Sequence, residues 1–258
     1  MKKKFSIIAS TLVLLLYTSA AISQKKTMTW TTKSDKAKEL ASKGVNHMMN
    51  IELPQAYEYF KQALDLDPDF TVALVFMANL SNGATKKAYS TKAVKSAANK
   101  TEGEKLFASL QDMGATQESR RETWTKLHNM FPDGKMISLY YLFTRATPAE
   151  QFTIGQEMLK KFPDEACFYN IMAYLYLQEK KDTATAKTYF EKYIAMYPGG
   201  SNPYDSMGEF YFMTGDMANS EKYYNMALDI YPFSSSSADK LKEIKALKEK
   251  NEAKASAN

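Results

Sequence analysis

Small and aromatic residues recur along the chain at a fixed spacing that ends in a proline. Each set steps by four, three and five residues. Steps of three and four place side chains on one face of an α-helix, so the pattern predicts a helix with a buried small–aromatic–small stripe. Proline lacks a backbone N–H and clashes with the preceding turn, so it ends the helix. Three sets share this spacing: Ala56, Phe60, Ala63 and Pro68; Ala186, Phe190, Tyr193 and Pro198; Ser220, Tyr224, Ala227 and Pro232.

An earlier helix is predicted before each of these stripes. Gly44 and Gly208 each lie 24 residues before the proline of their set, and 34 residues separate Pro198 from Pro232. A glycine opposite a small residue lets two helix backbones approach closely, and the aromatic ring fills the space beside the crossing. The unit is therefore a helical hairpin. A weaker copy has Val94 at the aromatic position: Ala78, Ser90, Val94, Ala97 and Glu102.

The middle of the chain keeps the spacing less well. Arg120 stands where a small residue is expected, and Gly155 stands at an aromatic position. We still expect hairpins over residues 102–129 and 134–161, with irregular helix crossings. One extra residue near 180–182 lengthens the turn inside the next unit.

Another amphipathic helix is predicted after the last proline. Leu241, Ile244 and Leu247 are spaced by three behind the serines at 234–237, and serine is a favoured helix start. A terminal unit needs its exposed face covered, so we expect a capping helix here. From Asn251 we expect a disordered tail.

These units resemble the tetratricopeptide repeat (TPR) family. The last unit is the best copy, from Ser201–Gly208 through Glu221–Leu228 to Pro232. The resemblance implies an all-α, right-handed superhelical solenoid of about six helix–turn–helix hairpins with a C-terminal cap. In this family the first helices line the concave face, which implies a ligand or peptide groove. The implied groove residues are Asn79, Asn82, Asn170, Tyr174, Leu177, Asn202, Asp205, Glu209 and Phe212. Alternatively, some of these residues pack between neighbouring repeats.

The first 23 residues have the three parts of a secretory signal peptide. Lys2, Lys3 and Lys4 precede an apolar run, and small residues lie before a plausible cleavage site between Ser23 and Gln24. We therefore expect a signal peptide at 1–23, a solenoid at 24–233, and a cap with its tail at 234–258. The predicted location is the periplasm or the extracellular space. An uncleaved inner-membrane signal anchor is the alternative.

Charge does not point to a nucleic-acid partner. The full chain carries a net charge of +5, and removal of residues 1–23 leaves +2. The segment 239–258 holds six lysines and four acidic residues, which leaves the body near neutral. A lysine face remains at Lys86, Lys87, Lys92, Lys95 and Lys100. It is either a site for a partner or an anionic envelope surface, or the solvated face of one helix.

Residue types that carry chemistry are few. Cys167 is the single cysteine, flanked by apolar residues, so we expect a core position, with intermolecular pairing as the alternative. His47 lies beside two methionines, but methionine commonly fills gaps between helices. His128 is expected near a helix end. We therefore expect no catalytic residues, no metal and no cofactor.

The sequence favours a non-catalytic exported scaffold that binds a protein or peptide in its groove. Ala41 and Val45 stand where the family's peptide-carboxylate groove needs lysine and asparagine, so binding of that type is not expected. The alternative is a solenoid that binds or processes cell-envelope glycans, and a third hypothesis is self-assembly. The oligomeric state is left open.

Overall fold

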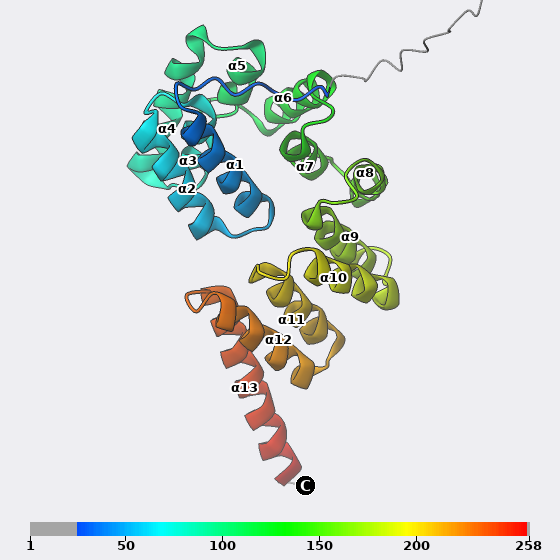
Figure 1. The fold of residues 1–258 in the computed structure, drawn as a ribbon. Coiled ribbons are helices and arrows are strands. Elements are labelled where there is room, and N and C mark those ends of the chain that lie inside the picture. Colours follow the sequence, from blue (N-terminus) through cyan, green and yellow to red (C-terminus); the bar gives the residue numbers. More distant parts are fainter. Residues whose placement is uncertain (1–24, 257–258) are drawn as a thin grey trace, which may run out of the picture.

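The computed structural model describes residues 25–256, and this part of the chain consists of α-helices and loops without a strand. Consecutive helices form six hairpins and a final single helix, which confirms the all-α repeat solenoid (Figure 1). The hairpins are α1 (Asp35–Met49) with α2 (Leu53–Leu66), α3 (Thr71–Asn79) with α4 (Gly83–Ser96), α5 (Glu102–Ser109) with α6 (Gln117–Met130), α7 (Lys135–Phe143) with α8 (Pro148–Lys161), α9 (Ala166–Gln178) with α10 (Thr183–Met196), and α11 (Asn202–Thr214) with α12 (Met217–Ile230). The predicted signal peptide lies outside the described residues.

The predicted glycine–aromatic crossings are present in the first and last hairpins. A Cβ atom on Gly44 would lie 2.9 Å from the Phe60 ring, and one on Gly208 would lie 3.0 Å from the Tyr224 ring. Both rings are buried. The absence of a side chain at each glycine is therefore what lets the ring of the second helix pack against the first.

The second hairpin departs from the predicted pattern. Val94 is 47% exposed, so the expectation that it fills the aromatic position is wrong. Ala93 is buried instead, whereas Ser90 is buried as expected, and its Oγ donates to Gln111 Oε1 at 3.2 Å. The chain then leaves α4 through a short 3-10 helix, Ala97–Asn99. Every residue of α3 from Thr71 to Ala78 is buried, because α2 and α5 pack against α3 in addition to α4.

Two irregular positions in the middle have local explanations. A Cβ on Gly155 would lie 2.5 Å from Met172 Sδ, so a methionine of the next hairpin fills the space that an aromatic ring fills elsewhere. Arg120 donates to the carbonyl oxygens of Leu110 and Asp112 and thereby caps the end of α5. The hairpins expected at 102–129 and 134–161 are present.

The capping helix is present as α13 (Ser235–Ser256). It packs on α12, with Ile244 fully buried and Leu241 and Leu247 half-buried. The helix continues past Asn251, where the sequence predicted disorder, and it is thus longer than the apolar pattern indicates.

An extended segment, residues 25–33, precedes α1 and is called the strap below. Lys26 exchanges two hydrogen bonds with Asp133, and Thr31 donates to Glu104 through both its N–H and its hydroxyl group at 2.8 Å. Met28 is buried beside Gly103 and Phe131. Figure 1 shows the strap as the dark blue segment running from the neighbourhood of α6 to the start of α1. It ties the first hairpin to the third and to the loop before α7.

Candidate functional site

A channel lies between the strap, α1 and α7. Both helices are the first of their hairpins, and they contact each other directly. The channel has a volume of about 560 Å³. Its apolar lining residues are Val45, Met49, Met136 and Ile137, and polar lining residues include Lys38, Ser42, Asn46, Lys135 and Glu165. An apolar floor with polar groups around it is the usual composition of a binding site.

The strap forms one wall of this channel and presents free backbone groups. Met28 points inward and is buried, whereas Thr27 and Thr29 are exposed. Within the described residues, the backbone N–H and C=O groups from Thr27 to Trp30 make no hydrogen bonds. An extended segment with unpaired backbone groups can add another extended chain along its edge.

The turn of the first hairpin is bonded to the loop between the fifth and sixth hairpins. Glu52 accepts from the Tyr197 hydroxyl at 2.7 Å and from the Ser201 backbone N–H at 3.0 Å. Asn50 Oδ1 accepts from the Tyr193 hydroxyl at 3.2 Å. We call these five residues the clasp. Both Asn50 and Glu52 are buried, so the clasp is a desolvated contact that closes the solenoid on itself.

His47 belongs to this contact. Its Nδ1 lies 2.7 Å from Glu52 Oε2, and its ring stacks on Tyr59 with centroids 5.2 Å apart. Across the described residues, no three His, Cys, Asp or Glu side chains come together as a possible metal site. His47 thus orients a buried carboxylate.

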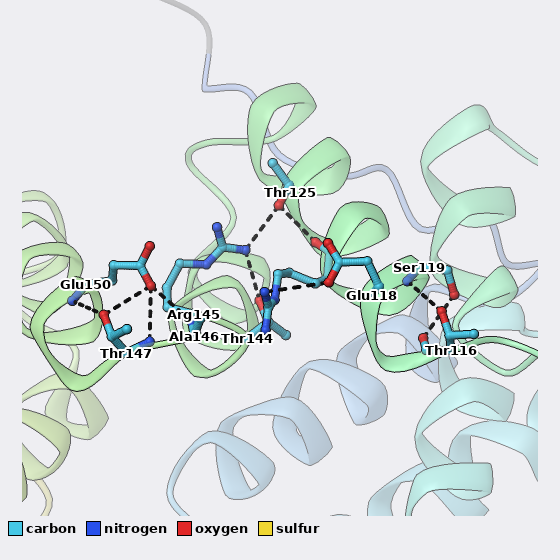
Figure 2. Close-up of polar contacts among 10 residues, drawn as sticks. Thr116, Glu118, Ser119, Thr125, Thr144, Arg145, Ala146, Thr147 and Glu150 are labelled. Carbon is cyan, nitrogen blue, oxygen red and sulfur yellow. Dashed lines mark hydrogen bonds and ion pairs between the residues drawn. The ribbon is translucent and has the colours of Figure 1, made fainter.

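A second polar cluster joins the third and fourth hairpins (Figure 2). Arg145 donates to Thr125 Oγ1 at 3.1 Å and to Thr144 Oγ1 at 3.2 Å, and its guanidinium lies 4.0 Å from the centroid of Tyr141. Tyr141 in turn stacks on His128 at 4.2 Å. Burial lowers the pKa of His128, with help from nearby Lys161 and Arg145. This cluster fixes α6 against the turn after α7.

Among the expected groove residues of α9 and α11, Tyr174 and Glu209 are bonded to each other, whereas Asn202 is bonded to α10. The Tyr174 hydroxyl donates to Glu209 Oε2 at 2.6 Å, and Asn202 Nδ2 donates to the Tyr193 hydroxyl at 3.0 Å. Burial raises the pKa of Tyr174 well above its usual range, and the nearby Glu209 carboxylate adds to this effect. Asn170 is buried, and its Oδ1 has no hydrogen-bond partner among the described residues.

The remaining expected groove residues are dispersed. Ser237 of α13 donates to Asp205, and Lys240 Nζ lies 4.4 Å from the centroid of Phe212, so the cap covers this part of α11. Asn79 accepts from Gln111 Nε2 at 2.8 Å. Leu177 is buried, and Asn82 is exposed at the N-cap of α4. Asn79 and Asn82 therefore lie on the second hairpin, whereas the other seven expected groove residues lie on α9 and α11.

One stretch of the chain matches a known repeat family. Residues 171–200 match the tetratricopeptide repeat family. For this stretch, which runs from α9 through α10, the resemblance seen in the sequence is confirmed. No significant match was found among curated protein sequences.

Solved structures similar to the chain include the following three. A chain of the Cut9–Hcn1 hetero-tetramer of the APC/C matches 81% of this chain with 16% identity and a TM-score of 0.49. The match covers 42% of the length of that chain. The type IV pilus biogenesis factor PilW has 13% identity over 81% of this chain and 99% of that chain, with a TM-score of 0.47. A thermophilic TPR protein of Thermus thermophilus has 14% identity over 81% of this chain and 98% of that chain, with a TM-score of 0.37.

Sequence reasoning from the TPR pattern missed the channel and the clasp. TPR positions on the first helices assign groove residues from each repeat separately, whereas the channel arises because α1 meets α7 and the strap. Glu52 and Tyr197 lie in turns and carry no periodic signal. The alternation of Met28 and Trp30 with threonines was the available signal for the strap.

The lysine face borders an open hollow of about 960 Å³. Lys87, Lys92, Lys95 and Lys100 line it together with Lys33 of the strap, and Asp67 and Asp69 lie among them. Asp67 is tied to Thr32 Oγ1 at 2.6 Å and to the Lys33 N–H at 2.9 Å. The hollow is therefore rich in positive charge but not uniformly basic. Among the described residues, no helix is long and apolar enough to span a membrane.

Proposed function

We propose that this chain is a non-catalytic scaffold that binds a protein segment in the channel between the strap, α1 and α7. The TPR fold commonly mediates protein–protein interaction. The observation that carries the proposal is the combination of an apolar floor with the unpaired backbone edge of the strap. A bound segment runs extended beside Thr27–Trp30, pairs its backbone with the strap, and places alternate apolar side chains on Val45 and Met136.

Export and location are part of the same proposal. The three-part signal pattern supports export to the periplasm or beyond. Lysines around the open hollow support an additional association with anionic material of the cell envelope. Nucleic acid is not proposed as a partner, because the body of the chain is near neutral.

The test fills the channel without disturbing the core. Ser42 and Asn46 line the channel from exposed positions on α1, so Ser42→Arg with Asn46→Arg should leave the fold intact. Peptides selected from a random library on the purified wild-type chain should bind at least ~10-fold more weakly to this variant. A photo-crosslinking amino acid at Asn46 should attach to the same peptides.

The matched control is Gln156→Arg, which adds the same side chain at an exposed position of α8. It should change the affinity of the selected peptides less than ~2-fold. Peptides that bind both variants equally well, or that crosslink from α8 and not from α1, contradict the channel as the binding site.

A further inference from the structure

A different cavity forms where the two ends of the solenoid meet, and we call it the junction cavity. It has a volume of about 380 Å³. Three segments line it: the turn of the first hairpin, the start of α11, and the loop between α12 and α13. The lining residues are Ile51, Glu52, Leu53, Pro54, Gln55, Ser201, Asn202, Asp205, Tyr231, Phe233 and Ser234–Ser236.

The polar groups of this cavity are suited to hydroxyl groups. Amides from Gln55 and Asn202, the carboxylate of Asp205 and the serine hydroxyls can each donate or accept one or more hydrogen bonds. No lysine or arginine is among the lining residues of this cavity. Since both charged groups, Glu52 and Asp205, are acidic, the cavity disfavours anionic ligands.

Several acceptors here lack partners among the described residues. Gln55 Oε1 is buried and accepts no hydrogen bond. Asp205 uses Oδ1 for Ser237, and Asn202 uses Nδ2 for Tyr193, which leaves Asp205 Oδ2 and Asn202 Oδ1 available. An unpaired buried acceptor is unfavourable, because nothing replaces the hydrogen bond that it made with water. The last torsion of a glutamine is soft, so the Gln55 amide can rotate to meet a hydroxyl group of a ligand.

An aromatic ring stands at the edge of the same cavity. Phe233 is 83% exposed, and its ring lies edge-on to Tyr231 with centroids 5.9 Å apart. A large exposed aromatic side chain beside hydrogen-bonding groups fits a ligand that has one apolar face and a hydroxylated edge.

Ile51, another lining residue of the cavity, has an unfavourable backbone conformation. Ile51 has a φ of 63°, in the left-handed region that β-branched residues rarely adopt. The clasp at Asn50 and Glu52 holds this turn in place from both sides. Strain of this kind persists where the surroundings impose it, and it concentrates at ligand sites.

We propose that the junction cavity binds a neutral mono- or disaccharide. Phe233 stacks on the apolar face of a sugar ring, while Gln55, Asn202 and Asp205 form hydrogen bonds with its hydroxyl groups. This site is separate from the channel, and it adds a saccharide ligand to the proposed protein-binding function. Its size, near the lower end of the ~300–1,000 Å³ range of ligand pockets, suits one or two sugar rings.

The experiment titrates the purified chain with cellobiose, lactose and N,N′-diacetylchitobiose, followed by ligand-observed NMR, with digalacturonic acid as the acidic comparison. At least one neutral disaccharide should bind, and Phe233→Ala should weaken it at least ~5-fold. Gln55→Leu keeps the side-chain size but removes the amide, and it should weaken the same sugar.

Phe143→Ala is the matched control, because Phe143 is another exposed phenylalanine, at the end of α7. It should change saccharide affinity less than ~2-fold. The proposal is overturned if none of the neutral disaccharides binds, if both phenylalanine variants behave alike, or if digalacturonic acid binds as well as the neutral sugars. Loss of peptide binding in the channel variant has no bearing on these outcomes, so the two proposals fail separately.

Discussion

The Tyr197 hydroxyl donates a 2.7 Å hydrogen bond to Glu52, a residue 145 positions earlier in the chain. Tyr197 ends α10 and Glu52 precedes α2, so this single bond joins the first hairpin to the fifth. Burial is the main reason that the pKa of Tyr197 lies above its usual range, and the hydrogen bond to Glu52 raises it further. The hydroxyl therefore stays protonated and keeps donating to the carboxylate across ordinary pH.

Tyr197→Phe removes only this donor. A hydrogen bond to a charged group contributes about 1.5–3 kcal/mol, so the free energy of unfolding in urea should fall by that order. Tyr204→Phe is the control, since its hydroxyl donates to the nearby Pro198 carbonyl in an exposed position. Equal losses in the two variants would show that the clasp adds nothing beyond a local contact.

Glu104→Ala should release the strap. The buried Glu104 carboxylate accepts from Thr31 and from Thr101, so it anchors the strap and caps α5 at once. We expect a loss of more than ~2 kcal/mol in unfolding free energy, because several donors lose their partner together. Trypsin should then cut faster after Lys26 and Lys33. Unchanged cleavage at these sites would contradict the anchoring role.

Gly155 and Met172 should behave as a coupled pair. Gly155→Phe alone should destabilise the chain by about 1–3 kcal/mol, because the ring competes with Met172 for one space. Adding Met172→Ala should recover part of this loss, since it vacates that space for the ring. A double-mutant cycle measures whether the changes in unfolding free energy of the two substitutions are additive. Strict additivity would show that the two side chains do not compete for the same space.

Asp205 should make stability fall as pH rises. Burial raises its pKa above the ordinary value of 3.8, with Glu209 adding to the effect. The folded chain holds the Asp205 proton more tightly than the unfolded chain does. The stabilisation from this proton is therefore fully present below the pKa that Asp205 has in the unfolded chain, and it is lost as pH rises through the pKa of the folded chain. Asp205→Asn should therefore be more stable than the wild type at pH 7. The difference between the two stability curves should shrink toward pH 3, and a constant difference would exclude this origin.

Cys167 should be unreactive in the folded protein. Its side chain is buried, and burial raises the pKa of the thiol far above its usual range. A thiol reagent at pH 8 should label it only after denaturant is added. Rapid labelling of the native chain, or a disulfide-linked dimer under oxidising conditions, would restore intermolecular pairing as an explanation.

The periodic part of the fold could be predicted because it is local. Ala56 and Phe60 are about one helix turn apart, and Gly44 lies 12 residues before Ala56 in the preceding helix, so their spacing predicts the hairpin. Val94 was misplaced because Ala93, one position earlier, is the residue that this helix buries between Ser90 and Ala97. Gly155 could not be interpreted, since the methionine that replaces its missing ring comes from the next hairpin.

The candidate sites were harder to predict for the same physical reason. Glu52 meets Tyr197, and Gln55 shares a cavity with Phe233, only because the solenoid curves far enough for its ends to meet. Curvature accumulates from small rotations between repeats, and no single residue encodes it. The strap likewise has too few residues for a periodic signal, although Met28 and Trp30 alternate with threonines.

The clasp also bears on how the chain unfolds. An open array of repeats frays from its ends, because each terminal unit has one neighbour to lose. Here the first hairpin touches the second along the chain and the fifth and sixth across the clasp, so neither end can peel away alone. We therefore expect the solenoid to unfold in one cooperative step, as a globular domain does. Its slowest amide protons should exchange with solvent at similar rates in all the hairpins.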